Sequence, residues 1–377
     1  MMLNKRYRSD INHTAISTLS LSAVTEASEA LNYTMPFFKT RTQHDFTGIP
    51  RTTNERMQTS VCDRAFDDAE ILSFKQGKTK HETVLYLGYG SNLAAETFLG
   101  KRGIRPLSQI NIVAPSITLT FDLPGLPYSE PCFANSRYRD DPSSGKPAPR
   151  PPYHKNAWKK GLVGVVYEVT KEDYAHIIAT EGGGSGYHDV LVDCYVLDSD
   201  PDKEVPSEPT GTPFRAHTLY AHRDRGLRED PDYAQPSARY LKLITSGAEE
   251  HDLPKEYRHF LRNIRTYHRT TTQQQLGSFI FLAVWGPILM FFFGGARIFL
   301  GKDGTYPKWF AKFAEAFFTA VWASYDGVFK STFGDGERTI GDDLDKDDYE
   351  NDSVPSEKTP LLVEEAARVR STPHSPV

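Results

Sequence analysis

The chain has 377 residues, a length that suits one large domain or two ordinary ones. Its formal net charge of −5 is mild and its basic residues are dispersed, which disfavours a nucleic-acid-binding protein. The three cysteines, Cys62, Cys132 and Cys194, lie far apart without a CxxC pair. We therefore expect neither a disulfide framework nor a structural metal site.

The first part of the chain divides into two segments of different composition. The segment 1–78 is polar and lacks sustained hydrophobic periodicity, so we predict that it is disordered. The segment 79–270 mixes short apolar runs with helical patterns, which predicts one mixed α/β domain. Strands are predicted at 83–90, 115–123, 161–169, 188–198 and 214–222. Helices are predicted at 93–100 and 170–181 and, as a broken pair, within 236–264.

The order of these elements bears on the fold class. Strands and helices alternate too irregularly for a doubly wound parallel sheet. The stretch 123–158 is rich in proline and is predicted to be a long surface insertion, with 132–138 as a strand edge within it. The helix at 170–181 begins with Thr170 and Asp173, which are spaced as a capping pair.

The chain becomes apolar beyond residue 270. The stretch 277–300 begins with twenty uncharged residues, a length that crosses a bilayer, and it predicts a transmembrane helix. The stretch 307–330 is aromatic-rich but carries charges, so it is either an amphipathic interfacial helix or a second membrane segment. The last stretch, 335–377, is acidic and is predicted to be disordered.

The charges around the apolar stretch predict its orientation. Arginines lie before it at 258, 262, 265 and 269, whereas the charge beyond 334 is mostly acidic. By the positive-inside rule, we expect the domain at 79–270 to face the cytosol. The sequence EKTPLL at 357–362 resembles an acidic dileucine sorting signal, which favours a vacuolar or endosomal membrane. Pairing of two copies into a homodimer is left open.

The first candidate site is the sequence YGSN at 89–92, between the first predicted strand and helix. Glycine lets backbone N–H groups approach a ligand closely, and the start of a helix favours an anion such as a carboxylate. The loop does not match GxSxG and lacks the lysine of a P-loop. The alternative interpretation is a tight turn in which Ser91 or Asn92 caps the helix.

The second candidate is Glu181, which ends the helix predicted at 170–181 and precedes the glycine run 182–184. The C-terminus of a helix carries partial negative charge, which disfavours an ionised carboxylate and raises its pKa. Such a carboxyl group is suited to hold and release a proton near neutral pH. The alternative interpretation is an exposed glutamate beside a flexible turn.

Three blocks of sequence are together similar to the γ-glutamylcyclotransferase family. They are YGSNL at 89–93, EGGGSGY at 181–187 and PSARYLKLITSGAEEHDLPKEY at 236–257. The third block is the most specific, and its matching positions are Pro236, Ser237, Tyr240, Gly247, Ala248, Leu253 and Pro254. The resemblance covers about half of the chain, roughly 82–265, and is to fungal members that also carry a C-terminal hydrophobic segment.

The resemblance implies a fold, a reaction and site residues. The fold would be a small mixed α/β barrel-like sheet, and the reaction would convert a γ-glutamyl compound into 5-oxoproline and a free amine without metal or other cofactor. Glu181 would be the proton acceptor and donor, and Tyr240 would line the pocket. The glutamyl end of this small-molecule substrate would bind Tyr86, Leu87, Gly88, Tyr89, Gly90, Ser91 and Asn92.

The implied mechanism uses the residues that the sequence itself singles out. Glu181 takes a proton from the α-ammonium group, the amine attacks its own γ-carbonyl, and the proton then passes to the departing nitrogen. The reaction is intramolecular, so the enzyme mainly folds the substrate into the reactive shape. Backbone N–H groups of 88–92 are candidates to stabilise the oxyanion.

Two features of the sequence leave the specificity open. The family often has a tyrosine seven residues after the acid, where this chain has His188, so a substrate-binding role for the neighbouring Tyr187 is open. The form YGSNL, in place of the shorter YGSL of glutathione-specific members, points to the general γ-glutamyl class. The alternatives are a γ-glutamylamine-specific cyclotransferase and a membrane-anchored, non-enzymatic binding module on the same fold.

Overall fold

The computed structural model describes residues 44–74, 82–139, 155, 157–180, 188–221, 228, 230, 232–299 and 308–341. The chain divides into a compact unit that ends at Thr339 and a second unit, Ile340–Val377. The second unit is described only at residues 340 and 341.

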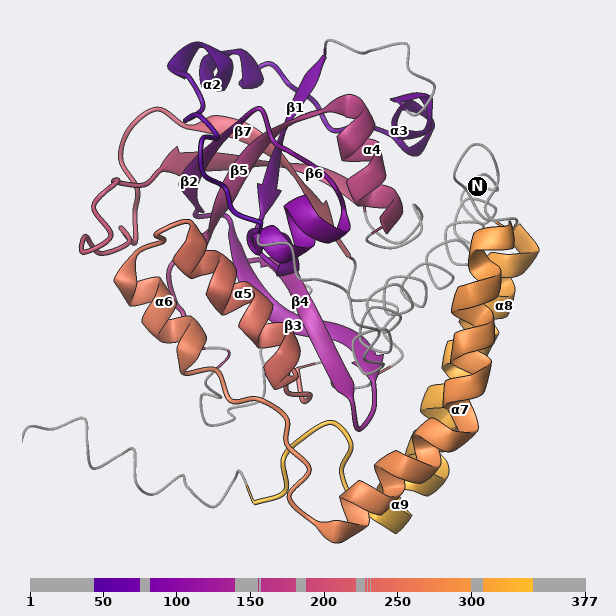
Figure 1. The fold of residues 1–377 in the computed structure, drawn as a ribbon. Coiled ribbons are helices and arrows are strands. Elements are labelled where there is room, and N and C mark those ends of the chain that lie inside the picture. Colours follow the sequence, from indigo (N-terminus) through magenta and orange to yellow (C-terminus); the bar gives the residue numbers. More distant parts are fainter. Residues whose placement is uncertain are drawn as a thin grey trace, which may run out of the picture. The chain divides into compact units, whose positions relative to one another are not determined.

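Five strands form a closed barrel in the order β1-β5-β2-β6-β7 (Figure 1). They are β1 (Thr83–Gly88), β2 (Ser108–Ala114), β5 (Leu162–Thr170), β6 (His188–Val196) and β7 (Phe214–Tyr220). Neighbouring strands pair antiparallel except β1 and β7, whose parallel contact joins Tyr86 to His217 and closes the ring. The prediction of a mixed α/β fold is confirmed. Strand β2 is not among the strands predicted from the sequence, although Ile110 and Ile112 alternate there with polar residues.

A separate two-stranded sheet is formed by β3 (Ile117–Leu126) and β4 (Glu130–Tyr138) (Figure 1). The prediction of a surface insertion is therefore wrong for 123–138, which lie in this hairpin and are largely buried, but the strand predicted at 132–138 is confirmed as part of β4. Proline is tolerated here because a two-stranded sheet leaves one edge of each strand without ladder hydrogen bonds. Within the hairpin, Asp122 and Arg137 form a buried ion pair with 2.6 Å between Oδ2 and Nε.

Three helices of the first unit agree with the predictions. They are α4 (Lys171–Thr180), α5 (Ala238–Glu250) and α6 (Lys255–Arg262). At the start of α4, the Asp173 N–H donates to Thr170 Oγ1 over 3.0 Å, as the capping pair predicts. The one or two helical turns predicted at 93–100 are a 3₁₀ turn, η1 (Ser91–Leu93), and a π-helix, η2 (Glu96–Lys101).

The segment 44–74 is part of the folded unit. It contains α2 (Asn54–Ser60) and α3 (Asp68–Phe74), and its apolar side chains Phe46, Met57, Ile71 and Phe74 are buried in the main core. The prediction of disorder at 1–78 is therefore wrong for 44–74, and its other residues lie outside the described ones. These few apolar residues have irregular spacing, so they give no periodic signal although each one packs against the barrel unit.

Four helical elements form the C-terminal part of the unit: α7 (Thr272–Phe299), α8 (Lys308–Ser324), η4 (Tyr325–Phe329) and α9 (Lys330–Phe333). α7 and α8 run side by side (Figure 1). A second apolar cluster joins them to the tip of the β3–β4 hairpin through Leu126 and Tyr128. Within the described residues, no helix combines the length and the apolar character needed to cross a membrane. The predicted transmembrane helix at 277–300 is therefore not supported.

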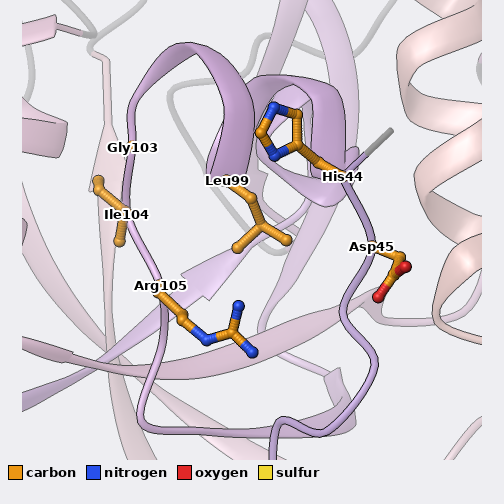
Figure 2. A pocket seen from close by; sticks show the side chains of 6 residues that line it. All are labelled: His44, Asp45, Leu99, Gly103, Ile104 and Arg105. Carbon is orange, nitrogen blue, oxygen red and sulfur yellow. The ribbon is translucent and has the colours of Figure 1, made fainter. Parts of the chain in front are cut away.

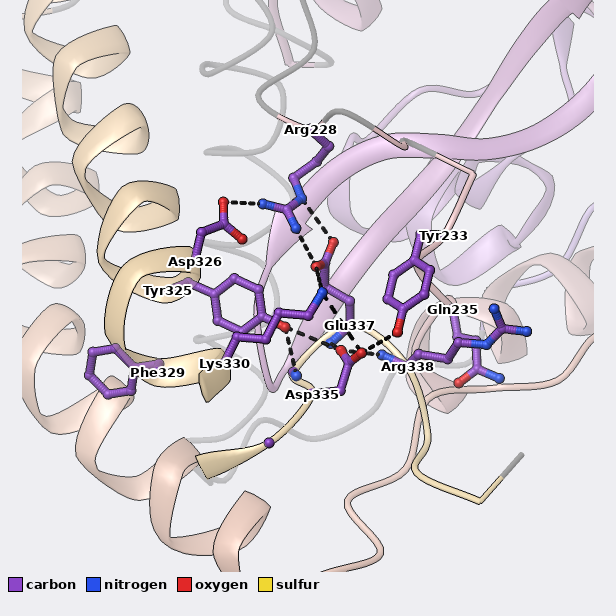
Figure 3. A network of polar contacts seen from close by, with 12 residues as sticks. Arg228, Tyr233, Gln235, Tyr325, Asp326, Phe329, Lys330, Asp335, Glu337 and Arg338 are labelled. Atoms are coloured by element: carbon purple, nitrogen blue, oxygen red, sulfur yellow. Dashed lines mark hydrogen bonds and ion pairs between the residues drawn. The ribbon is translucent and has the colours of Figure 1, made fainter. Parts of the chain in front are cut away.

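The turn at 334–339 is a buried polar junction (Figure 3). The carboxylate of Glu337, which is 1% exposed, accepts hydrogen bonds from Nε and Nη2 of Arg228. Arg228 also pairs with Asp326 on η4, over 2.5 Å. Burial raises the pKa of Glu337, and the charges of Arg228 and Lys330 oppose that rise.

Backbone hydrogen bonds connect this turn to the rest of the unit. The Tyr128 N–H donates to the Gly336 carbonyl over 2.7 Å, and the Gln235 N–H donates to the Glu337 carbonyl over 2.9 Å. Tyr128 lies between β3 and β4, and Gln235 lies shortly before α5. The prediction of disorder from residue 335 is therefore wrong for 335–341; the rest of that tail lies outside the described residues.

Candidate functional site

The first loop, residues 88–92, leaves the end of β1 and enters the 3₁₀ turn η1. The turn is closed by the Leu93 N–H, which donates to the Gly90 carbonyl over 3.1 Å. Among the described residues, the backbone N–H groups of Gly90 and Ser91 have no acceptor. The loop therefore presents two adjacent donors to a ligand, as a site that stabilises a negative oxygen requires.

The Asn92 side chain fixes the shape of this loop through hydrogen bonds. Its Nδ2 donates to Tyr86 Oη over 2.8 Å, and its Oδ1 accepts from Arg102 Nε over 2.7 Å. The Asn92 carbonyl accepts from Tyr167 Oη over 3.2 Å. Because Asn92 is 1% exposed, its amide fixes the shape of the loop rather than facing an open surface.

Uncharged polar and aromatic side chains surround Tyr167, which donates to the Asn92 carbonyl. His251 Nε2 lies 2.7 Å from Tyr167 Oη, and the ring of Phe46 lies 4.2 Å from the imidazole. Burial lowers the pKa of His251 to about 4, so the imidazole is uncharged at neutral pH. Burial likewise raises the pKa of Tyr167 well above its ordinary value. The loop therefore rests on uncharged polar groups.

Two glycines allow other elements to approach the loop closely. A Cβ on Gly88 would lie 2.9 Å from the Tyr167 ring. A Cβ on Gly247, in α5, would lie 2.3 Å from the Leu93 carbonyl carbon. Both distances are too short for any side chain, so glycine is needed at each position for this packing. This explains why Gly247 is a specific part of the third sequence block.

Tyr240 reaches the first loop from α5. Its Oη accepts from the Ala134 N–H of β4 over 3.2 Å. A Cβ on Gly90 would lie 3.5 Å from Tyr240 Oη and 3.6 Å from the Ala134 Cβ. Ser237 caps α5 by accepting from the Tyr240 N–H over 3.0 Å, which fixes the start of the helix. The structure thus brings Tyr240 beside Gly90, and adds Ala134, which sequence reasoning did not include.

The remaining residues assigned to the loop lie on or beside β1. Tyr86 and Leu87 are buried, and Leu87 belongs to the apolar core. Tyr89 is buried, and its Oη donates to the Leu219 carbonyl over 3.4 Å. These side chains therefore hold the loop in place, and its backbone is the part that remains for a ligand.

The end of α4 lies next to the first loop. Arg102, which donates to Asn92, also donates through Nη1 to Thr180 Oγ1. Thr180 is the last residue of α4, and Glu181 follows it in the chain. Glu181 and Tyr187 themselves lie outside the described residues. No short motif in the sequence identified Arg102, because its two partners are distant in the sequence and only the tertiary fold brings them together.

A buried polar cluster lies where the described chain resumes after Tyr187. Asp189 accepts from Tyr174 Oη over 2.5 Å and from the Phe66 N–H over 2.6 Å. The Nδ1 of His217 lies 2.9 Å from Asp189 Oδ2, and the Phe66 ring stacks on the imidazole. The cluster therefore fixes the start of β6 against α4, β7 and the segment 44–74. In the described part of the chain, no group of His, Cys, Asp and Glu side chains could hold a metal ion.

The surface also carries a hollow of about 360 Å³ that is separate from this loop (Figure 2). None of the predicted site residues lines it. Its lining residues are His44, Asp45, Leu99, Gly103, Ile104 and Arg105. The hollow is therefore not the site that the sequence motifs predict.

A small closed barrel with a glycine loop at a strand end, braced against the end of a helix, is an arrangement typical of a small-molecule site. Comparisons with known proteins indicate which family of small-molecule-binding proteins this is. A family model described as the AclK C-terminal domain matches residues 271–331. The gamma-glutamyl cyclotransferase gliK of Aspergillus fumigatus is 28% identical over 269 residues, which cover 68% of this chain and 90% of the relative.

The family to which the chain belongs is shown by a second relative. The gamma-glutamyl cyclotransferase verK of Clonostachys rogersoniana is 31% identical over 177 residues, which cover 46% of this chain and 93% of the relative. The chain therefore belongs to the γ-glutamyl cyclotransferase family. A solved structure named gamma-glutamyl cyclotransferase is 19% identical, with a TM-score of 0.35, over 52% of this chain and 96% of that chain.

Proposed function

We propose that this protein converts a γ-glutamyl amino acid or peptide into 5-oxoproline and the free amine. Membership of the γ-glutamyl cyclotransferase family supports this reaction. The structural observation that supports it most is the bridge from Asn92 through Arg102 to Thr180. Thr180 is the last residue of α4, and it directly precedes Glu181 in the sequence. One site would then contain both motifs that the sequence singles out.

The proposed chemistry assigns one role to each motif. The Glu181 carboxylate takes a proton from the substrate's α-ammonium group, and the freed amine attacks the γ-carbonyl carbon. The oxygen that becomes negative accepts from the backbone N–H groups of Gly90 and Ser91. The bond from the γ-carbon to the departing nitrogen then breaks as Glu181 returns the proton to that nitrogen, and the second proton lost by the ring nitrogen passes to the released amine, which leaves as an ammonium ion. The first loop supplies orientation, which is the main requirement of an intramolecular reaction.

The loop environment fits this assignment of roles. The side chains that brace the loop, among them Asn92 and Tyr86, bond to one another and leave the backbone for the substrate. Tyr240 lies beside Gly90, where it would contact the glutamyl part. Tyr187 is proposed as a further contact. The leaving group is proposed to be an amino acid, a peptide or a glutathione-derived conjugate.

The test is 5-oxoproline release by the full chain from γ-glutamyl-alanine, glutathione and an S-substituted glutathione. Wild type is expected to release it from at least one of them. Glu181→Gln is expected to lose at least about 10²-fold in kcat, because general acid–base catalysis supplies that much. The matched control is Glu172→Gln, an exposed acid in the first turn of the same helix, which is expected to behave as wild type.

Two outcomes would contradict this function. A folded wild-type chain that releases no 5-oxoproline from any of the three substrates would favour a binding module on the same fold. Full release by Glu181→Gln would mean that another group moves the proton.

We also propose that the C-terminal helices attach the protein to the cytosolic surface of a membrane. Large apolar side chains on these helices are exposed to solvent, and Phe279 is the most exposed at 71%. The others are Leu276, Val284, Ile288, Met290, Phe313 and Val328. Aromatic and aliphatic side chains on helices of this kind bind the boundary of headgroups and acyl chains. Co-sedimentation of the full chain with phosphatidylcholine vesicles is expected, with at least a threefold decrease for Phe279→Ser; equal binding of both would contradict the proposal.

A further inference from the structure

Arg102 is placed by the local structure that follows the first loop. It directly follows the π-helix η2 as its C-cap, where its N–H donates to the Thr97 carbonyl over 2.9 Å. Gly103 follows with φ +67°, a conformation that glycine adopts without strain, and turns the chain away. The backbone of Arg102 is therefore fixed on both sides, and the side chain is half-buried. Single π-helical turns are frequent at functional sites.

The guanidinium group joins two segments that are distant in the sequence. Its Nε donates to Asn92 Oδ1 over 2.7 Å, and its Nη1 donates to Thr180 Oγ1. The orientation of the Asn92 amide is set by its other end, because Nδ2 donates to Tyr86 Oη. Each contact uses a different nitrogen of one rigid, planar group. The distance between the first loop and the end of α4 is therefore set by the guanidinium itself.

Thr180 is suited to receive this contact. Its Oγ1 lies 2.8 Å from the His176 carbonyl and 3.0 Å from the Ile177 carbonyl, to which it donates within the last turn of α4. The carbonyl groups at the end of a helix lack partners in the next turn and carry partial negative charge. A cation at this place is favourable, so Arg102 fixes the helix end by charge as well as by geometry.

We infer that Arg102 is a positioning residue for the reaction: it holds the chain at Thr180, and hence the attachment point of Glu181, at a fixed distance from the first loop. This inference rests on the proposed function, since its effect on the rate depends on Glu181 being the proton acceptor. Arg102 itself takes no part in proton transfer. A displacement of about 1 Å in a catalytic group lowers a rate by roughly 10²-fold, so the loss of this bridge is expected to lower kcat.

The experiment is a double-mutant cycle in the full chain, with kcat and KM measured for γ-glutamyl-alanine or the best substrate of wild type. Thr180→Val keeps the side-chain volume but removes the acceptor, and it is expected to lower kcat about tenfold with KM within about twofold. Arg102→Met is expected to lower kcat by about 10- to 100-fold. If both changes break one bridge, the double variant is expected to be no slower than Arg102→Met.

Two further variants separate positioning from general stability. Arg102→Lys keeps the charge, but one ammonium nitrogen cannot reproduce the two-nitrogen fork, so kcat is expected to stay at least threefold below wild type. Arg105→Met removes an exposed arginine on the same segment, and it is expected to keep the wild-type kcat. Melting temperatures of all soluble variants are expected to lie within a few degrees of wild type.

The outcomes are distinguishable from failure of the proposed function. An inactive wild type overturns the function, whereas an active wild type with an inactive Glu181→Gln variant supports it independently of Arg102. If the wild type is active and the Glu181→Gln variant is not, a Thr180→Val variant that keeps the kcat of wild type overturns the inference, even if Arg102→Met does not fold. Losses that multiply in the double variant also overturn it, because the two residues would then act separately.

Discussion

Two arginines join distant segments of this molecule, but they do so with different partners. Arg102 connects the first loop to α4 through an amide oxygen and a hydroxyl group, Asn92 Oδ1 and Thr180 Oγ1. Arg228 connects the C-terminal turn to η4 through two carboxylates, those of Glu337 and Asp326. A neutral partner can be lost with little charge imbalance, whereas the loss of a buried carboxylate leaves a cation without compensation. The first contact is therefore expected to control activity and the second to control stability.

The largest expected effect is at the C-terminal turn. Replacing Glu337 by Gln would leave Arg228 without its buried carboxylate, so the free energy of unfolding is expected to decrease by about 3 kcal/mol or more. Urea denaturation of the full chain measures this. The control is Asp326→Asn, because the Asp326 side chain is 48% exposed and its loss is expected to change stability by less than about 1 kcal/mol. Equal effects of both changes would contradict the distinction between buried and exposed partners.

The second effect is at the contact between α5 and the first loop. Gly247→Ala would place a methyl group against the backbone of Leu93, and the strain is expected to destabilise the protein by about 1–3 kcal/mol. The displaced loop is also expected to raise KM. Gly286→Ala is the matched control, since a Cβ there meets no atom within 4 Å. If the Gly247 variant kept wild-type stability and KM, the close approach of α5 would not shape the loop.

The smallest effect is a dependence of stability on pH beneath the first loop. The folded pKa of His251 is about 4, below its ordinary value of 6.5, so the unfolded chain binds the proton more readily. Well above pH 6.5 the imidazole is uncharged in both the folded and the unfolded chain, so it has no effect on stability. As the pH falls from 6.5 towards 4, the unfolded chain binds the proton first, and the free energy of unfolding decreases. At pH 5.5 the loss is expected to be about 1 kcal/mol.

Urea denaturation at pH 7.5 and 5.5 measures this loss. His251→Gln is expected to reduce the difference between the two pH values, whereas the same change at the exposed His259 is expected to leave it as in wild type. An undiminished difference in the His251 variant would show that other groups cause it.

The parts of the fold that could be predicted are those that depend on local spacing. Strand β1, helix α4 with its Thr170 cap and the helix pair α5 and α6 are examples, because periodicity and capping residues lie within each element. The juxtaposition of Tyr240 and Gly90 followed from the family resemblance. The class of reaction rested on that resemblance as well.

The parts that could not be predicted depend on partners that are distant in the sequence. Phe66 contributes a ring and an N–H group to His217 and Asp189, yet nothing near Phe66 indicates order. Glu337 lies in an acidic stretch whose composition is typical of disorder, and its burial depends on its pairing with Arg228 and on the backbone hydrogen bond from Gln235, which are both distant in the sequence. The bridge at Arg102 depends in the same way on the fold as a whole.

The most direct test of the central claim, that the first loop and the end of α4 form one site, is a crystal structure of the Glu181→Gln full chain with γ-glutamyl-alanine. We expect the γ-carbonyl oxygen within hydrogen-bond distance of the Gly90 and Ser91 N–H groups, and the α-amine facing residue 181. A ligand bound elsewhere, for example in the hollow lined by His44 and Arg105, would contradict the account.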